Sequence, residues 1–535
     1  MLPYYNLIIT EVMRVRIKKG VSRIMPGPAK VACITIDAAD HTLLRLWAKQ
    51  GLLPHFSKLL EESVSSETRN PEIIYTGTLW ASFNTGVWPG RHNHYFYLQP
   101  DSRSYGLRRF FPEDVSVDSI WNPIAREGRR VALIDLPKSR LEHLPQTLQV
   151  SFWGEHEVMR PLICWPPSLE QEVRHIAGKD PVGACDLVRQ RPDELRRFRD
   201  GLIERATRRG DLALAILARG PWDLFVLNFS EAHCAGHHLW AARDPEHPKH
   251  RPSLRSALGE DPLLDVYQAI DRSLGRIVEA LGRENFLLVL ATHGMGPRYD
   301  AAAAFDAILR RLDGIDAPTT SGPIEAARKV WHQIPGFVRR PFRRMMDRLY
   351  DASRQAERAK RRFFVIPTTD NCGAIRVNLK GREPEGQVEP GAPYHKLCDW
   401  LKAELLALRN VQTGAPVVTR VLLGDNLFAG PYRNDFPDLV IEWNNEAPIP
   451  AVRSQAIGEI RVEPTNSRTG DHRPKGFVLA RSPYLQPHAL QGAVSLVDLA
   501  PTLAAQLGVQ LSGIDGKPIP EFISVGRLAT RKVYA

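Results

Sequence analysis

Short apolar runs that end in polar residues recur along the chain. The runs at 31–36, 130–137, 222–233, 285–294 and 437–443 each have the length and composition of a buried strand. Helical patterns lie between them, at 43–60 with a break expected at Pro54, at 193–217 and at 263–281. This alternation predicts an α/β fold with a mostly parallel central sheet covered on both faces, in which chemistry gathers beyond the carboxyl ends of the strands.

The composition indicates a globular protein. With 535 residues, 43% of them apolar and 24% charged, the chain has enough material for about three domains or for one large α/β domain with insertions. Six cysteines without CxxC spacing indicate neither a disulfide framework nor a thiolate zinc site, so we expect them to be reduced and mostly buried. No apolar run is long enough to span a membrane and no signal core is evident, which predicts a cytoplasmic protein.

The net charge of +11 is concentrated in two segments. Residues 1–30 carry six basic side chains and one acidic, and residues 324–362 carry twelve and four, so the rest of the chain is near neutral. This distribution argues against a nucleic-acid-binding domain. The segment 324–362 also repeats apolar residues at helical spacing, which fits either a lid helix with a solvated basic back or peripheral contact with a membrane surface.

Several polar residues follow the predicted strands, and each alone is weak evidence for a site. Asp37 could be an ordinary turn former, and a threonine at 76 or 78 could simply cap a helix. His233 and His237 are four residues apart, so on a helix both rings project from one face and can share a metal ion. His293 ends another strand and His472 lies in the segment TGDHRPKG. Their order along one α/β chain makes them more informative together than singly.

This ordered set resembles the alkaline phosphatase superfamily, and within it the type I phosphodiesterase/nucleotide pyrophosphatase-like branch. The resemblance rests on Ile36-Asp37, on 76–92, on 230–237, on HGMGP at 293–297 and on GDHRP at 470–474. It implies an alkaline phosphatase-like α/β/α sandwich with a helical basic insertion. The implied division is an N-terminal extension at 1–27, a first part of the catalytic core at 28–300, a lid or cap at 301–370, and a second core part at 371–535.

The resemblance also implies a set of site residues. Thr76 takes the position of the nucleophile, with Thr78 as the alternative. Asp37, Thr76 and His293 would form one metal site, and His233, His237 and His472 the other. The ions would be divalent, zinc first and manganese as the alternative.

Two departures from the family pattern are visible. His233 stands where the family usually has Asp, which exchanges one zinc ligand for another. Thr292 stands immediately before His293, where the family usually has Asp. The implied metal site of Asp37, Thr76 and His293 therefore has one carboxylate fewer than in the family, and the number of bound ions, one or two, stays open. Glu231 or Asp471 could supply the missing ligand.

These observations predict a metal-dependent hydrolase of a phosphodiester or related phosphoester, either a small molecule or a lipid. The alternatives are a degenerate, non-catalytic member that keeps one metal site and, less favoured, a sulfatase- or phosphomutase-type relative. A sulfatase needs a Cys or Ser nucleophile followed by Arg, and the segment 76–80 has neither. The natural substrate, its leaving group and the oligomeric state are not encoded in these motifs.

Overall fold

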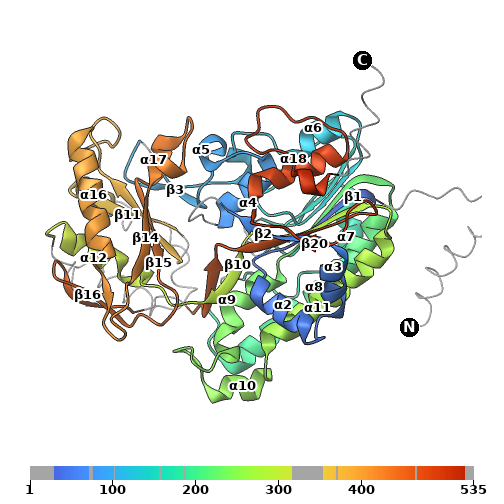
Figure 1. The fold of residues 1–535 in the computed structure, drawn as a ribbon, viewed down its shortest axis with the longest axis horizontal. Helices are drawn as coiled ribbons and strands as arrows, with labels where there is room; N and C mark the ends of the chain where they lie inside the picture. Colours follow the sequence, from blue (N-terminus) through green and yellow to red (C-terminus); the bar gives the residue numbers. More distant parts are fainter. Residues whose placement is uncertain are drawn as a thin grey trace, which may run out of the picture.

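We describe the protein from a computed structural model, in which the described residues are 29–70, 76–101, 103–155, 160–185, 187–315, 354–368, 371–463 and 467–523. Its main feature is a ten-stranded sheet in the order β20-β2-β19-β9-β1-β8-β5-β6-β7, with β21 paired to β2 (Figure 1). The strands are β1 (Ala29–Ile36), β2 (Val64–Arg69), β5 (Val131–Ile134), β6 (Thr147–Ser151), β7 (Ile163–Trp165), β8 (Trp222–Phe229), β9 (Phe286–Ala291), β19 (Gly476–Arg481), β20 (His488–Ala489) and β21 (Val494–Ser495).

The centre of this sheet is parallel. β1 pairs with β8 on one side and β9 on the other, and β5 pairs with β8 and β6, all in parallel register. β19 is antiparallel to both of its neighbours, and β7 is antiparallel at the edge. The central strands are buried along almost their whole length, which explains why their sequences are apolar runs without alternation.

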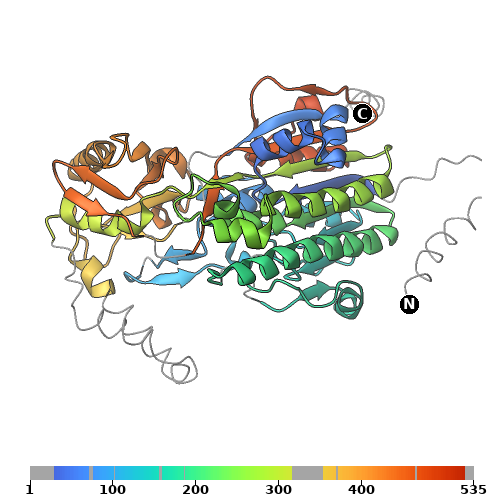
Figure 2. The same ribbon diagram turned by 90° about the horizontal axis from the view of Figure 1, so that it is seen from below.

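Helices cover both faces of the sheet (Figures 1 and 2). One face is packed by α2 (His41–Lys49), α3 (Pro54–Glu62), α7 (Leu169–Ala177), α8 (Pro192–Ala218), α9 (Glu231–Arg243), α10 (Pro252–Leu258) and α11 (Pro262–Leu281). The other face is packed by α4 (Thr76–Thr85), α6 (Trp121–Arg126) and α18 (Leu496–Gln506). The predicted α/β/α sandwich with a mostly parallel sheet is therefore confirmed.

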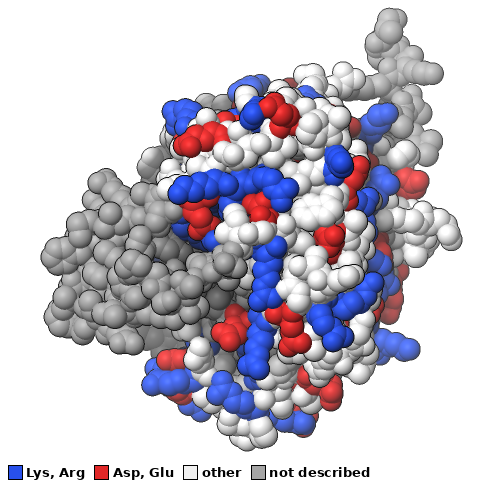
Figure 3. Space-filling model, turned by 90° about the vertical axis from the view of Figure 1, so that its left-hand side faces the viewer, with Lys and Arg blue, Asp and Glu red and all other residues white. Residues whose placement is uncertain are grey.

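A second, smaller unit is built on its own four-stranded antiparallel sheet. Its order is β11 (Phe363–Ile366), β12 (Cys372–Val377), β15 (Leu439–Trp443) and β14 (Val418–Leu423), and α12 (Phe305–Leu312) and α16 (Ala392–Leu406) pack on it. A three-stranded sheet of β13 (Arg409–Asn410), β16 (Ala451–Ser454) and β17 (Gly458–Arg461) completes this unit. On the described part of its outer face, basic and acidic side chains are interspersed (Figure 3).

The chain returns from the smaller unit through β18 (Gly470–Arg473), which pairs antiparallel with β10 (Gly294–Pro297). The predicted boundary at residue 370 differs from this arrangement, because β12, β14 and β15 belong to the smaller unit and the large sheet resumes only at β19. The strand predicted at 437–443 exists, but an apolar run carries no information about which sheet it joins.

Helix boundaries follow the sequence closely. The predicted helix at 43–60 is two helices, α2 and α3, and the second begins at Pro54, where a proline is tolerated in the first turn. The N-terminal extension at 1–27 and most of the basic segment 324–362 lie outside the described residues. Among the described helices, none is both long and apolar enough to cross a membrane.

One expectation about the cysteines is wrong. Cys185 and Cys234, 49 positions apart, form a disulfide, with a Cα–Cα distance of 6.0 Å that falls in the usual range. Their spacing in the sequence carries no pairing signal, because the fold alone brings the loop before α8 onto α9. Cys33, Cys164, Cys372 and Cys398 are buried thiols, as expected.

The cytoplasmic location stays a prediction.

Candidate active site

Three adjacent strands of the large sheet deliver the site residues to one edge. Asp37 directly follows β1, His293 follows β9, and α9 with its histidines follows β8. Because β9, β1 and β8 are neighbours in parallel register, their carboxyl ends lie side by side. The Asp37 N–H donates to the carbonyl of Phe229, 2.8 Å away, and this bond ties the ends of β1 and β8 together. The predicted clustering of these residues is therefore seen in the structure.

Three buried histidines converge next to this edge. His233 and His237 lie one turn apart on α9, and His472 comes from β18. One ring nitrogen from each lies within 4.8 Å of the others, and Nε2 of His472 is 3.0 Å from Nε2 of His233. Ligand nitrogens on a tetrahedral zinc ion at about 2.1 Å stand about 3.4 Å apart, so these imidazoles have the spacing of a metal site.

Backbone and carboxylate partners orient two of these rings. Nδ1 of His237 lies 2.9 Å from the carbonyl of Gly470, which can only accept, so Nδ1 is the protonated nitrogen. Nε2 of His237 is then a lone-pair nitrogen, and it is buried without a hydrogen-bond partner among the described residues. Nδ1 of His472 lies 3.2 Å from Oδ1 of Asp471. An imidazole backed by a carbonyl or carboxylate is the usual arrangement of a zinc-binding histidine.

Burial keeps His237 in the protonation state that a metal requires. Burial lowers the pKa of His237 well below its usual value, and the positive charge of Arg468 adds to this effect, so its imidazole is neutral. Burial alone would raise the pKa of Asp471, but the hydrogen bond and charge of His472 hold it below its usual range. The site therefore combines the neutral imidazole of His237 with the ionised carboxylate of Asp471, which lies behind the imidazole of His472.

Asp37 and His293 form a second group beside the triad. Nε2 of His293 is 3.9 Å from Oδ1 of Asp37, and the indole N–H of Trp80 donates to the same oxygen at 3.1 Å. The ring of His293 has its centroid 4.9 Å from that of His472, so the two groups are contiguous. The hydroxyl of Thr292 does not take the place of a carboxylate ligand, because its Oγ1 lies 2.8 Å from Nδ1 of His293.

Helix α4 supplies the two candidate nucleophiles. Thr76 is its first residue, so the backbone N–H groups of its first turn lie at a helix N-terminus, where anions are favoured. Thr78 is fully buried, and its hydroxyl donates to the carbonyl of Tyr95 at 2.5 Å. Behind the helix, Lys138 and His94 approach Gly77 so closely that a side chain there would meet His94.

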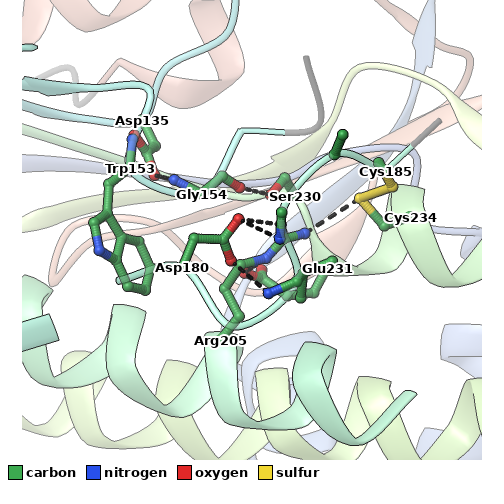
Figure 4. A network of polar contacts seen from close by, with 12 residues as sticks. Asp135, Trp153, Gly154, Asp180, Cys185, Arg205, Ser230, Glu231 and Cys234 are labelled. Carbon is green, nitrogen blue, oxygen red and sulfur yellow. Dashed lines mark hydrogen bonds and ion pairs between the residues drawn. A yellow bond between two sulfur atoms is a disulfide. The ribbon is translucent and has the colours of Figure 1, made fainter. Parts of the chain in front are cut away.

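The two acidic neighbours, Glu231 and Asp471, each have a basic partner. Glu231 accepts from Nε of Arg205 at 3.1 Å (Figure 4) and from Nε of Arg209 at 3.0 Å, with all three side chains fully buried. Arg209 also pairs with Asp135 at 2.5 Å. Asp471 faces its own neighbour, His472, instead. The suggestion that Glu231 or Asp471 supplies the missing ligand stays a prediction.

This buried ionic network was missed from the sequence, although a signal was present. Arg205 and Arg209 stand on the apolar stripe of α8, where Leu202, Ala206 and Ala213 are also buried. A charged residue on the buried face of an amphipathic helix requires a charged partner. Here that partner is Glu231 in the first turn of α9, so the network fixes the start of the helix that carries His233 and His237.

Other histidines near the site have separate partners. Nε2 of His238 lies 2.8 Å from the carbonyl of Cys185, so His238 is off the shared face of α9. Nδ1 of His250 lies 2.8 Å from the carbonyl of Ala241. His247 is buried rather than solvent-facing, and it stacks on Tyr299 with ring centroids 5.6 Å apart.

Comparison with solved structures identifies similar folds at low sequence identity. The phosphonoacetate hydrolase from Sinorhizobium meliloti 1021, solved with phosphonoformate, is 13% identical with a TM-score of 0.54, and the match covers 90% of this chain and 96% of that one. The same hydrolase with phosphonoacetate gives a TM-score of 0.50 at 12% identity, with the same shares covered. Murine ectonucleotide pyrophosphatase/phosphodiesterase 5 is 12% identical over 90% of this chain and 95% of that one, with a TM-score of 0.46. The likeness to the phosphonoacetate hydrolase describes the fold.

No curated protein matches the chain. The sequence model of the family described as type I phosphodiesterase/nucleotide pyrophosphatase, however, matches residues 31–450. That match spans most of the large sheet, the candidate nucleophile helix, α9 and most of the smaller unit. The chain therefore belongs to the type I phosphodiesterase/nucleotide pyrophosphatase family, within the alkaline phosphatase superfamily.

Proposed function

We propose that this protein hydrolyses a phosphodiester or a related phosphoester, with Thr76 as the nucleophile and a divalent ion, zinc, held by His233, His237 and His472. One observation carries the proposal: three buried imidazoles converge at metal-ligand spacing. Family membership supports phosphoester hydrolysis as the reaction. The substrate is a small-molecule or lipid phosphoester.

The hydrogen bonds of α4 favour Thr76 over Thr78. The hydroxyl proton of Thr78 is donated to the carbonyl of Tyr95 in a fully buried position, which leaves no room for an attack on phosphorus. Thr76 begins the helix, next to the N–H groups that would receive the phosphoryl oxygens. In the proposed reaction the Thr76 oxygen attacks phosphorus, the alcohol leaves, and water later cleaves the phosphothreonine.

The chain's own residues prepare this reaction by fixing charge and orientation. Trp80 orients Asp37 through its indole N–H, Thr292 orients His293, and Nε2 of His293 lies 3.9 Å from Oδ1 of Asp37. A bound divalent ion would supply Lewis acidity, which lowers the pKa of an oxygen nucleophile and stabilises charge on the phosphoryl group. The triad would hold one ion tightly, whereas Asp37 and His293 offer only two ligands besides Thr76 and would hold a second weakly.

Thr292 keeps a second candidate open, that of a non-catalytic relative with a single metal for binding or structure. The two candidates differ in one observable. A catalyst loses turnover when the Thr76 hydroxyl is removed but keeps its metal at the triad, whereas a binding protein has no turnover to lose.

The test combines metal content by elemental mass spectrometry with turnover of bis-p-nitrophenyl phosphate. Wild type is expected to contain about one to two ions per chain and to turn over the ester. His237→Ala should lose both, and Thr76→Ala should lose turnover alone. His238→Gln is the matched control on the same helix, because a Gln amide can still donate to the carbonyl of Cys185. A wild-type protein with less than about one ion and no turnover would refute the hydrolase.

Two further expectations belong with this proposal. A cytoplasmic location and peripheral membrane contact through 324–362 both remain predictions, and most of that segment lies outside the described residues. Vesicle co-sedimentation of the full chain, with anionic and with neutral lipid, tests the membrane contact directly.

A further inference from the structure

A cavity of about 210 Å³ lies between the large-sheet unit and the smaller unit, close to the histidine triad. On one side it is lined by the loop after α9, with His247 and Lys249, and by the segment after β10, with Arg298 to Asp300. On the other side it is lined by Ile449 and its flanking prolines, by Val462 and by Arg468. We call it the Arg298/Arg468 pocket.

The pocket and the triad share one stretch of backbone. The N–H of Thr469 donates to the carbonyl of His237 at 2.7 Å, and the N–H of Arg298 donates to the carbonyl of Thr469 at 2.9 Å. Lys249 Nζ donates to the carbonyl of Arg468 at 3.2 Å. Arg468 precedes His472 by four residues, a span of at most about 14 Å even in extended chain. The Cα atoms of Arg468 and His472 are therefore no farther apart than the length of an ordinary metabolite.

The lining carries an excess of positive charge. Lys249, Arg298 and Arg468 are cationic, and Asp300 is the carboxylate among the lining residues. Asp300 accepts from Nε of Arg298 at 2.7 Å and from the N–H of Ala302 at 3.0 Å. His247 adds no charge near neutral pH, because burial lowers its pKa to about 4. The net charge of these four side chains is therefore +2. A net positive charge in a partly enclosed space attracts an anion more strongly than it would on an open surface.

The remaining walls suit the carbon skeleton of a ligand. Ile449 and Val462 are buried apolar side chains of the smaller unit, and the stacked rings of Tyr299 and His247 form the opposite wall. Tyr299 is held in place by its hydroxyl, which donates to Asp244 at 3.2 Å. The lining therefore combines cationic groups with apolar surface, which is the composition of a small-molecule site with a charged anchor.

We infer that the Arg298/Arg468 pocket binds a second anionic group, a carboxylate or a phosphate, that the substrate carries in addition to the ester cleaved at the triad. This inference rests on the proposed function and narrows its substrate class to phosphoesters with an additional negative charge. Arg468 is the main residue that binds this second anion, because it belongs to the same segment as His472, a residue of the site of cleavage.

The test uses p-nitrophenyl phosphodiesters of straight-chain alcohols that differ only at the far end, which is a methyl, a carboxylate or a phosphate. At one chain length, the wild-type kcat/KM for an anionic end is expected to exceed that for a methyl end by roughly tenfold or more, the effect of a charge-assisted hydrogen bond. Arg468→Gln should bring this ratio close to one, and Arg468→Lys should restore part of it. Arg420→Gln, a half-exposed arginine of the smaller unit paired with Glu442, is the matched control and should keep the wild-type ratio.

The outcomes separate this inference from the function on which it rests. A ratio near one at every chain length in wild type, with turnover intact, overturns the inference but not the hydrolase. If inorganic phosphate activates cleavage of the methyl-ended ester while that ratio stays near one, the anion is a separate molecule and the inference is again overturned. If no ester is cleaved, calorimetric titration with inorganic pyrophosphate decides: binding by wild type that is lost in Arg468→Gln supports the pocket, and equal binding or none refutes it.

Discussion

The hydroxyl of Thr292 lies 2.8 Å from Nδ1 of His293, and Nε2 of the same ring points toward Asp37 at 3.9 Å. Thr292, which departs from the family pattern, thus orients the ring of His293. A carboxylate at position 292 would instead contact the metal ion. This relationship explains how the site can keep its shape with one acidic group fewer.

Thr292→Asp is expected to strengthen the second metal position. The new carboxylate would add an anionic ligand to Asp37 and His293, so occupancy should rise from about one to about two ions per chain. Elemental mass spectrometry across a zinc titration measures the change. Thr292→Asn, which matches the size of Asp without its charge, is the control, and a rise in that variant as well would show that charge is not the cause.

Glu231→Gln is expected to destabilise the protein by about 3–5 kcal/mol, because it leaves the buried guanidinium groups of Arg205 and Arg209 with one carboxylate too few. Urea unfolding measures the change in free energy. Since Glu231 sits in the first turn of α9, zinc affinity should fall as well.

Glu170→Gln provides the comparison. It breaks an exposed pair with Arg174 four residues along α7, and such pairs contribute less than about 0.5 kcal/mol. Equal losses in the two variants would contradict the importance of the buried network.

Two of the six cysteines should be unreactive without a reductant. In denaturant, Cys33, Cys164, Cys372 and Cys398 are expected to react with a thiol reagent, and Cys185 and Cys234 only after reduction. Peptide mapping by mass spectrometry checks the linkage. Replacing both paired cysteines by Ser should cost about 2–4 kcal/mol of stability. Six reactive thiols in the protein as isolated would be evidence against the disulfide.

Asp438 makes the smaller unit sensitive to acid. Burial alone would raise its pKa, but hydrogen bonds and charge from Arg382 outweigh burial and lower the pKa to about 2. Because the folded-state pKa lies below the unfolded value, the carboxylate contributes its full stability above about pH 4 and loses it as the pH falls toward 2, a difference of about 2 kcal/mol.

The corresponding variant is Asp438→Asn. It should flatten the dependence of the unfolding free energy on pH between about 4 and 2. Asp425→Asn, at a more exposed carboxylate paired with Arg433, is the control and should keep the wild-type slope. An unchanged slope in Asp438→Asn would contradict this assignment.

The parts of the fold that the sequence predicts well are those fixed by local periodicity. The central strands and the helices α8 and α11 were predicted to within a few residues, because a buried parallel strand and an amphipathic helix each have their own pattern. The clustering of Asp37, His233 and His293 follows from the same reasoning, since parallel strands end at one edge of the sheet.

Features that depend on contacts between distant segments could not be predicted in this way. The pairing of Arg209 with Glu231 and Asp135 joins three elements whose order in space no local pattern gives. The same is true of the disulfide and of the sheet that the strand at 437–443 joins. The buried arginines on α8 did carry a signal, namely charge on an apolar stripe, but it identifies a need for partners and not the partners themselves.

The antiparallel pairing of β18 with β10 has a consequence for the order of synthesis. His233, His237 and His293 leave the ribosome before the smaller unit is made, whereas His472 follows it. A nascent chain that ends at residue 463 would have two imidazoles of the triad and no partner strand for β10. The third imidazole arrives only when the chain has folded back, so tight zinc uptake would distinguish finished molecules from truncated ones.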